Sequence, residues 1–202
     1  MKQSLNIEVL IIIILVAAFG FTTFQRNFVW KDDYSLWGDC VEKSYEKVEP
    51  HNNFGVACKD RGMLDKAIYH YKRALNIKPD VVAAIKNLGV AMSDKGNFEE
   101  AAQYFSKALA VNPEDFDAHY QLGRILEKQG KVNEAMRHFD EVIRINPDYA
   151  LAYNEIGIIL AKKGKLQKSN DFFLKAIQLK PDCTEAKDNL LILEQMMQQD
   201  EK

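Results

Sequence analysis

The residues of this chain that could do chemistry are four histidines and three cysteines. The histidines form two pairs of equal spacing, His51 with His70 and His119 with His138, nineteen residues apart in each pair. A zinc site needs ligands that converge, as two histidines four residues apart do on one helix face. A separation of nineteen does not give that arrangement, so the sequence predicts no metal site and no cofactor.

No other set of reactive side chains has a catalytic spacing. Cys40, Cys58 and Cys183 contain no CxxC pair, which argues against a zinc site or a disulfide framework and favours inert burial. Gly164-Lys165 is followed by leucine, so no phosphate-binding loop is present. The net charge is −2 with both signs mixed, which leaves no basic footprint for nucleic acid. We therefore expect neither an enzyme nor a nucleic-acid-binding protein.

The elements that must position these residues recur every 34 residues along the 202-residue chain. A fixed period of this length indicates a solenoid of stacked units, and solenoids expose long concave surfaces that hold partners. One proline series and two glycine series carry the period: Pro79, Pro113, Pro147 and Pro181; Gly55, Gly89, Gly123 and Gly157; and Gly62, Gly96, Gly130 and Gly164.

Each repeat predicts two helices joined by a glycine turn. Apolar residues four apart, such as Phe54 and Cys58, form a buried stripe on the first helix. One glycine lies inside this helix, where glycine costs about 1 kcal/mol relative to alanine, so we expect it to permit close approach of the second helix. The other glycine series ends the first helix in a left-handed conformation. A small residue and, four residues later, an aromatic residue predict tight packing of the second helix.

This pattern resembles the tetratricopeptide repeat over residues 48–183. The four histidines are interpreted as ordinary residues of its repeats, without a chemical role. The resemblance implies an all-α solenoid of four helix–turn–helix units, here called repeats 1 to 4: 48–81, 82–115, 116–149 and 150–183. Residues 31–47 are interpreted as a capping half-repeat helix. Residues 184–202 are interpreted as a C-terminal capping helix, because Leu191 stands where a repeat has glycine.

The first 30 residues differ from the rest. Val9–Phe24 is uncharged and almost wholly apolar, and its 16 residues would span about 24 Å as a helix. A spanning helix usually needs about 20 residues, so we interpret 1–30 as a short membrane anchor and juxtamembrane segment in a single-pass protein. Trp30, Tyr34 and Trp37 are expected at the membrane–water interface. A cleaved signal peptide and a buried soluble helix are the alternatives.

A second resemblance concerns the junction between this segment and the repeats. Arg26-Asn27-x-x-Trp30-x-Asp32, Leu36-Trp37 and Asn52-Asn53-Phe54-Gly55 are similar to the join in multi-spanning tetratricopeptide membrane proteins of the O-mannosyltransferase type and their bacterial relatives. In those proteins the repeats face away from the cytosol. The resemblance implies extracytoplasmic repeats, on the periplasmic side in a bacterium. Only one candidate span is present, so nothing about glycosyl transfer carries over.

The tetratricopeptide resemblance also implies that the first helices line a concave face. Asn53, Asn87 and Gln121 occupy one place of successive repeats, and a row of amides can hold an extended peptide backbone because amides both donate and accept. O-GlcNAc transferase repeats use a comparable asparagine row. The alternative is that these side chains are merely solvated. The predicted binding-groove residues are Asn52, Asn53, Val56, Lys86, Asn87, Val90, Tyr120, Gln121, Arg124, Asn154 and Ile158.

The resulting functional prediction is a membrane-tethered scaffold that binds a protein or an extended peptide in its concave groove. Two alternatives stay open at this stage. One is an accessory, substrate-presenting subunit of a membrane glycosyltransferase or export machine. The other is a self-assembling structural coat, which would make the size of the repeat domain depend on its concentration.

Overall fold

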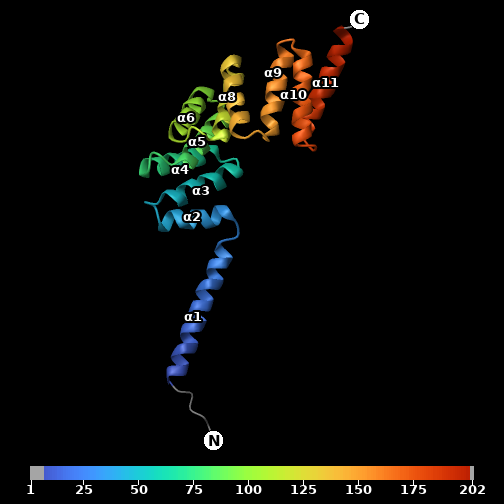
Figure 1. Ribbon diagram of the computed structural model, residues 1–202. Helices are drawn as coiled ribbons and strands as arrows, with labels where there is room; N and C mark the ends of the chain where they lie inside the picture. The colour runs from blue at the N-terminus through green and yellow to red at the C-terminus, as the bar shows by residue number, and fades with distance from the viewer. Residues whose placement is uncertain (1–6, 201–202) are drawn as a thin grey trace. The chain divides into compact units, whose positions relative to one another are not determined.

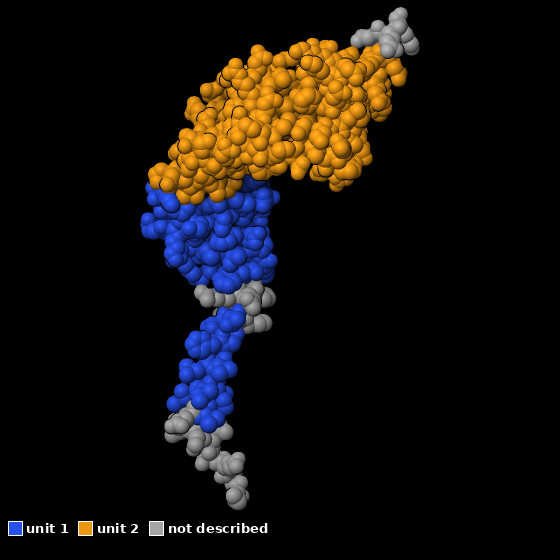
Figure 2. Space-filling view, viewed as in Figure 1, with its two compact units in different colours: residues 1–78 blue, residues 79–202 orange. Residues whose placement is uncertain are grey.

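A computed structural model describes residues 7–200, with side chains for 9–23 and 30–198. In this range the chain forms eleven α-helices and no strand (Figure 1), which confirms the all-α prediction. The chain divides into two compact units, residues 1–78 and residues 79–202 (Figure 2). The predicted terminal segments 1–30 and 184–202 include residues 1–6 and 201–202, which lie outside the described residues.

Unit 1 contains one helix pair preceded by two single helices. Helix α2 begins at a capping box, in which the Ser35 backbone N–H donates to the Asp32 side chain at 2.9 Å and the Asp32 N–H donates to the Ser35 hydroxyl at 3.2 Å. Such a box satisfies N–H groups that have no partner within the helix. Helix α3 packs on both α2 and α4. The helices are α1 (Ile7–Val29), α2 (Asp33–Lys43), α3 (Val48–Asp60) and α4 (Leu64–Ile77).

The prediction of a membrane anchor is wrong, because no helix among the described residues is both long and apolar enough to cross a bilayer. The apolar run Val9–Phe24 would rise only about 24 Å, whereas the hydrocarbon core is about 30 Å thick. The described side chains of α1, residues 9–23, are exposed. The predicted single-pass localisation is wrong for the same reason, and the extracytoplasmic side that the junction resemblance implied presupposed that anchor. The side chains of Arg26 and Asn27, two residues of the junction pattern, lie outside the described part.

Unit 2 contains three helix pairs and a final single helix. Helix α10 contacts both α9 and α11, and the three helices lie side by side (Figure 1). The pairs are α5 (Val82–Asp94) with α6 (Phe98–Val111), α7 (Phe116–Lys128) with α8 (Val132–Ile145), and α9 (Ala150–Lys162) with α10 (Leu166–Leu179); the single helix is α11 (Thr184–Asp200).

The turn inside each pair has the backbone conformation that the glycine series predicted. The φ angle is 76° at Gly130 and 71° at Gly164, in the left-handed region that glycine enters without the penalty a Cβ atom brings. After Gly164, the Lys165 N–H donates to the Leu160 carbonyl at 2.9 Å. This bond closes the Schellman motif and satisfies a carbonyl at the end of the first helix.

The glycines inside the first helices permit the close helix packing that the sequence predicted. A Cβ atom at Gly157 would lie 2.5 Å from the ring of Phe173, and one at Gly123 would lie 2.7 Å from the ring of Phe139. Both rings are buried. Ser169 replaces the alanine of the other repeats, and its buried hydroxyl donates to the Gly157 carbonyl at 2.8 Å. The polar atom therefore keeps a partner at the tightest point of the pair.

Candidate functional site

Two clefts flank helix α7 in unit 2, and they share Gln121 and Arg124. We call the two clefts together the groove. The smaller cleft, of about 240 Å³, is lined by Val90, Ser93, Asp94, Phe105, Gln121, Arg124, Ile125 and Lys128. The larger cleft, of about 430 Å³, is lined by Tyr120, Gln121, Arg124, Tyr149, Leu151, Glu155, Lys180, Asp182, Cys183, Thr184 and Glu185.

Glu155 on α9 is the most buried charged residue of the larger cleft, and its side chain is 14% exposed. The Tyr120 hydroxyl donates to Glu155 Oε1 at 3.1 Å, and Arg124 Nε lies 3.7 Å from the same oxygen. The Tyr120 and Tyr149 rings meet edge to face, with their centroids 5.2 Å apart. The cleft therefore combines aromatic walls with a carboxylate held by one hydrogen bond.

Burial shifts the pKa of both Glu155 and Tyr120. It raises the pKa of the Glu155 carboxyl above its ordinary value, although the hydrogen bond from Tyr120 and the charge of Arg124 lower it in part. Burial, followed by the charge of Glu155, raises the pKa of Tyr120 well above its usual range. Tyr120 consequently stays protonated and remains a hydrogen-bond donor at physiological pH.

Two lysines connect helices of successive repeats beside the groove. Lys86 Nζ on α5 lies 3.0 Å from Asp115 and 2.8 Å from Asp117. Burial opposes its charge, but the hydrogen bonds to Asp117 and Asp115 outweigh burial and raise the pKa of Lys86. Lys162 on α9 pairs with Glu127 on α7 at 2.7 Å. These cations are engaged within the fold, so we assign them to repeat stacking.

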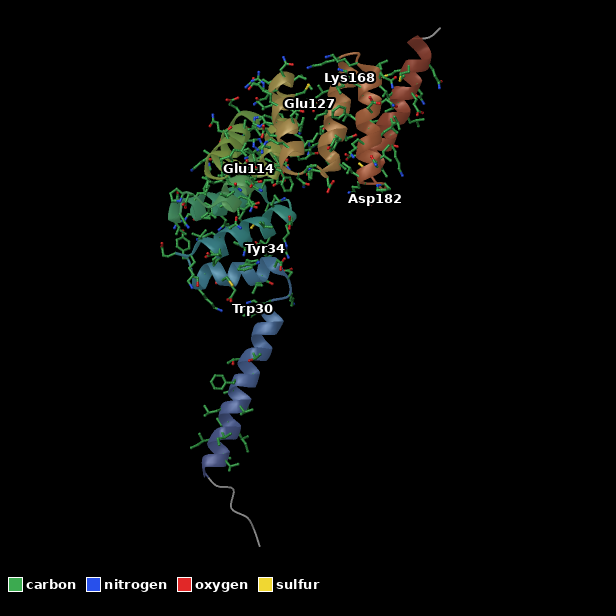
Figure 3. The ribbon with its side chains drawn as sticks, viewed as in Figure 1. Trp30, Tyr34, Glu114, Glu127, Lys168 and Asp182 are labelled. Atoms are coloured by element: carbon green, nitrogen blue, oxygen red, sulfur yellow. The ribbon has the colours of Figure 1, made fainter. Side chains whose placement is uncertain are left out.

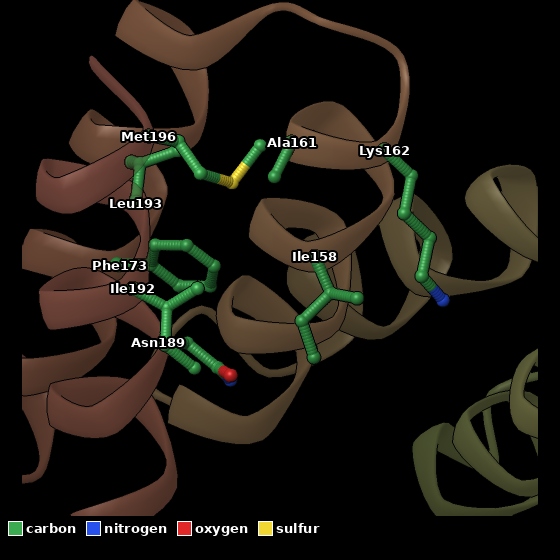
Figure 4. Close-up of a pocket in the computed structure, with 8 residues that line it drawn as sticks. All are labelled: Ile158, Ala161, Lys162, Phe173, Asn189, Ile192, Leu193 and Met196. Carbon is green, nitrogen blue, oxygen red and sulfur yellow. The ribbon is translucent and has the colours of Figure 1, made fainter. Parts of the chain in front are cut away.

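Only some of the predicted groove residues of unit 2 line the groove. Four of them line the groove: Val90, Tyr120, Gln121 and Arg124. Asn154 is buried and accepts a hydrogen bond from Asn189 of α11 at 2.9 Å, so it joins helices instead of facing the groove. Ile158 lines a third cleft of about 200 Å³ between α9, α10 and α11 (Figure 4).

The other predicted residues lie on α3 and α5. Asn52, Asn53 and Val56 are half-buried on α3, and the Asn52 amide donates to Asn53 Oδ1 at 3.2 Å. Asn87 is half-buried on α5. Because Asn53 belongs to unit 1 and Asn87 to unit 2, a continuous amide row across the repeats stays a prediction.

Sequence reasoning missed the side chains that the α10–α11 turn and the start of α11 contribute to the larger cleft: Lys180, Asp182 and Glu185. Asp182 lies in this turn (Figure 3). The groove prediction counted places along the first helices only, and no pattern in the sequence indicates that a turn reaches the same cleft.

Sequence reasoning also missed that the histidines contact each other in pairs, because it interpreted them as ordinary residues of the repeats. In unit 1, His51 Nδ1 on α3 lies 3.0 Å from His70 Nδ1 on α4, and His51 Nε2 lies 2.8 Å from the Tyr45 carbonyl oxygen. A carbonyl only accepts, so Nε2 of His51 carries a proton. In the neutral pair His51 therefore accepts at Nδ1, and His70 donates from its own Nδ1.

Unit 2 contains the same arrangement. His119 Nδ1 lies 2.9 Å from His138 Nδ1, and His119 Nε2 lies 3.1 Å from the Pro113 carbonyl oxygen. Burial lowers the pKa of His70 to about 4, and the charges of His51 and Lys66 add to this effect. Burial, followed by the charge of His119, also lowers the pKa of His138. Burial thus favours the neutral form of His70 and of His138.

The chain is similar to known proteins in two ways, in sequence to some and in fold to others. A part of this chain is 30% identical over 71 residues to the protein O-mannosyl-transferase Tmtc3 of Drosophila melanogaster, and 30% identical over 73 residues to TMTC1 of Homo sapiens. These matches cover 35% and 36% of this chain but only 8% of either relative. Activities of the whole relatives therefore do not transfer.

Solved structures of MamA share the fold. One crystal structure of MamA has a TM-score of 0.67 at 24% identity and covers 72% of this chain and 85% of that chain. MamA 41-end from Desulfovibrio magneticus RS-1 has a TM-score of 0.68 at 22% identity and covers 75% of this chain and 85% of that chain. At these identities the likeness concerns the fold alone.

Family models agree with the helix pairs and their glycine turns. A model described as a TPR repeat matches residues 55–96, and two described as tetratricopeptide repeats match residues 93–156 and 150–183. Together they extend from the first predicted repeat to the end of the last one. The chain belongs to the tetratricopeptide-repeat family.

Proposed function

We propose that this protein is a non-enzymatic interaction scaffold that binds an extended segment of a partner protein in the groove beside α7. The observation that carries the proposal is the pair of adjoining clefts, of about 430 and 240 Å³, that meet at Gln121 and Arg124. Repeats 48–183 would form the binding part, and residues 31–47 and 184–202 would cap its ends.

Gln121 is the residue best placed to hold a peptide backbone. It lines both clefts, and a side-chain amide offers two donors and an acceptor to the N–H and C=O groups of an extended chain. Binding through the main chain gives affinity that depends little on sequence, whereas pockets for the side chains add specificity. The groove contains both elements.

We expect the substitution Gln121→Ala to weaken peptide binding about fivefold, because a net hydrogen-bond contribution of about 1 kcal/mol is lost. Peptides would be selected from a phage-displayed random library on the full chain, and their affinities would be measured by fluorescence anisotropy. The matched control is Gln167→Ala, which removes an exposed amide from α10. Equal affinity of the Gln121 variant and the wild type for every selected peptide would refute binding in the groove.

A further inference from the structure

The larger cleft of the groove has an unequal distribution of charge. Its acidic lining residues are Glu155, Asp182 and Glu185, and its basic ones are Arg124 and Lys180. The carboxylates come from α9, from the α10–α11 turn and from the start of α11, so they face the cleft from several elements. A ligand group that neutralises this excess would be favoured because its charge complements that of the cleft.

Glu155 retains capacity to accept hydrogen bonds. A carboxylate has about four acceptor positions. Among the described residues Glu155 accepts one hydrogen bond, from Tyr120, and the guanidinium Nε of Arg124 at 3.7 Å is beyond hydrogen-bond distance. A carboxylate that is only 14% exposed recovers little hydration, so a charged donor entering the cleft would supply contacts that water supplies poorly.

The walls of the cleft suit the stem of a long basic side chain. Tyr149 and Leu151 line the cleft and are half-buried, and the edge-to-face contact with Tyr120 fixes the Tyr149 ring. Lysine and arginine cover apolar surface with their methylene stems while their charged ends reach a polar partner. Aromatic faces add cation–π attraction for the same groups.

We propose that the segment bound in the groove presents a lysine or arginine side chain that enters the larger cleft and pairs with Glu155. This inference rests on the proposed function, and it adds the chemistry of the partner: an extended peptide with a basic residue at the position that faces α9.

Two measurements on selected peptides test the charge pair. We expect peptides selected on the full chain to contain a shared basic residue, and replacing it by norleucine should weaken binding to the wild type about tenfold, as for a lost charge-assisted hydrogen bond. Glu155→Gln should weaken binding of the basic peptide by a similar factor. It should have little effect on the norleucine peptide, because the partner charge is already gone. Glu134→Gln, which changes an exposed carboxylate on α8, is the matched control.

The outcomes separate this inference from the proposed function. Peptides that bind less well to the Gln121→Ala variant but are indifferent to norleucine and to Glu155→Gln would overturn the basic-residue inference and leave the groove as a binding site. Peptides indifferent to all three changes, or a library without binders, would overturn both. Norleucine is introduced into the peptide, so this arm does not depend on the folding of any variant.

Discussion

Replacing Gly157 by alanine is expected to destabilise unit 2 by about 1–3 kcal/mol, the usual cost of overpacking a core. The added Cβ atom would lie 2.5 Å from the ring of Phe173, which is 1% exposed. Alanine has a higher helix propensity than glycine by about 1 kcal/mol, so any net loss of stability reports the clash. Urea unfolding followed by circular dichroism measures the change.

Two companion variants identify the cause of the loss. Gly20→Ala places a Cβ atom in the interior of α1 with nothing within 4 Å, and no destabilisation is expected. Combining Gly157→Ala with Phe173→Leu should cost less than the sum of the single changes, because the smaller side chain leaves room for the Cβ atom. A Gly157→Ala protein as stable as the wild type would contradict the packing account.

Lowering the pH from 7 to 4 is expected to decrease the free energy of unfolding of unit 1 by up to about 3 kcal/mol through His70 alone. Its pKa is about 4 in the fold against 6.5 for the free side chain, and each pKa unit corresponds to about 1.4 kcal/mol. Between these values the unfolded chain binds more protons than the folded one. The contribution of His70 to the free energy of unfolding is therefore complete above pH 6.5 and is lost as the pH falls toward 4. His138, whose pKa is also lowered, adds a loss of the same sign in unit 2.

Repeat 4 supplies the control for this prediction. At the places of His51 and His70 it has Tyr153 and Phe172, whose rings are 6.0 Å apart, and the Tyr153 hydroxyl donates to the Pro147 carbonyl at 3.0 Å. Replacing both histidine pairs by Tyr–Phe pairs should therefore keep the packing and remove the titrating groups. Urea midpoints at pH 7, 5.5 and 4 would fall less steeply in this variant. A parallel acid response in both proteins would show that other groups control it.

The sequence predicted the glycine conformations because their causes are local or follow the repeat. A glycine that ends a helix needs a left-handed φ whatever surrounds it, and Gly130 and Gly164 have that angle. A glycine that recurs inside a helix, at a known energetic cost, indicates contact with another helix, and Gly157 meets Phe173 in that way. The all-helical fold followed from the same period of 34 residues.

The predicted site depended on contacts that the period does not encode. Lys86 and Asn154 were predicted to face the groove. However, the carboxylates of Asp115 and Asp117 engage Lys86, and Asn154 pairs with Asn189 of α11. On α7, Gln121 and Arg124 line the groove, and their role in binding stays a prediction.

The sequence by itself determined the repeat, its two helices, its turns and its packing glycines, because each depends on the backbone or on a place that recurs in every repeat. Only the tertiary structure decided which polar side chains meet. His51 and His70 are nineteen residues apart along the chain, yet they face each other because α3 and α4 pack as a pair. Glu155 likewise lines a cleft that α7, α9 and the α10–α11 turn form together. Partners and burial arise from three-dimensional neighbours, which one chain's spacing does not specify.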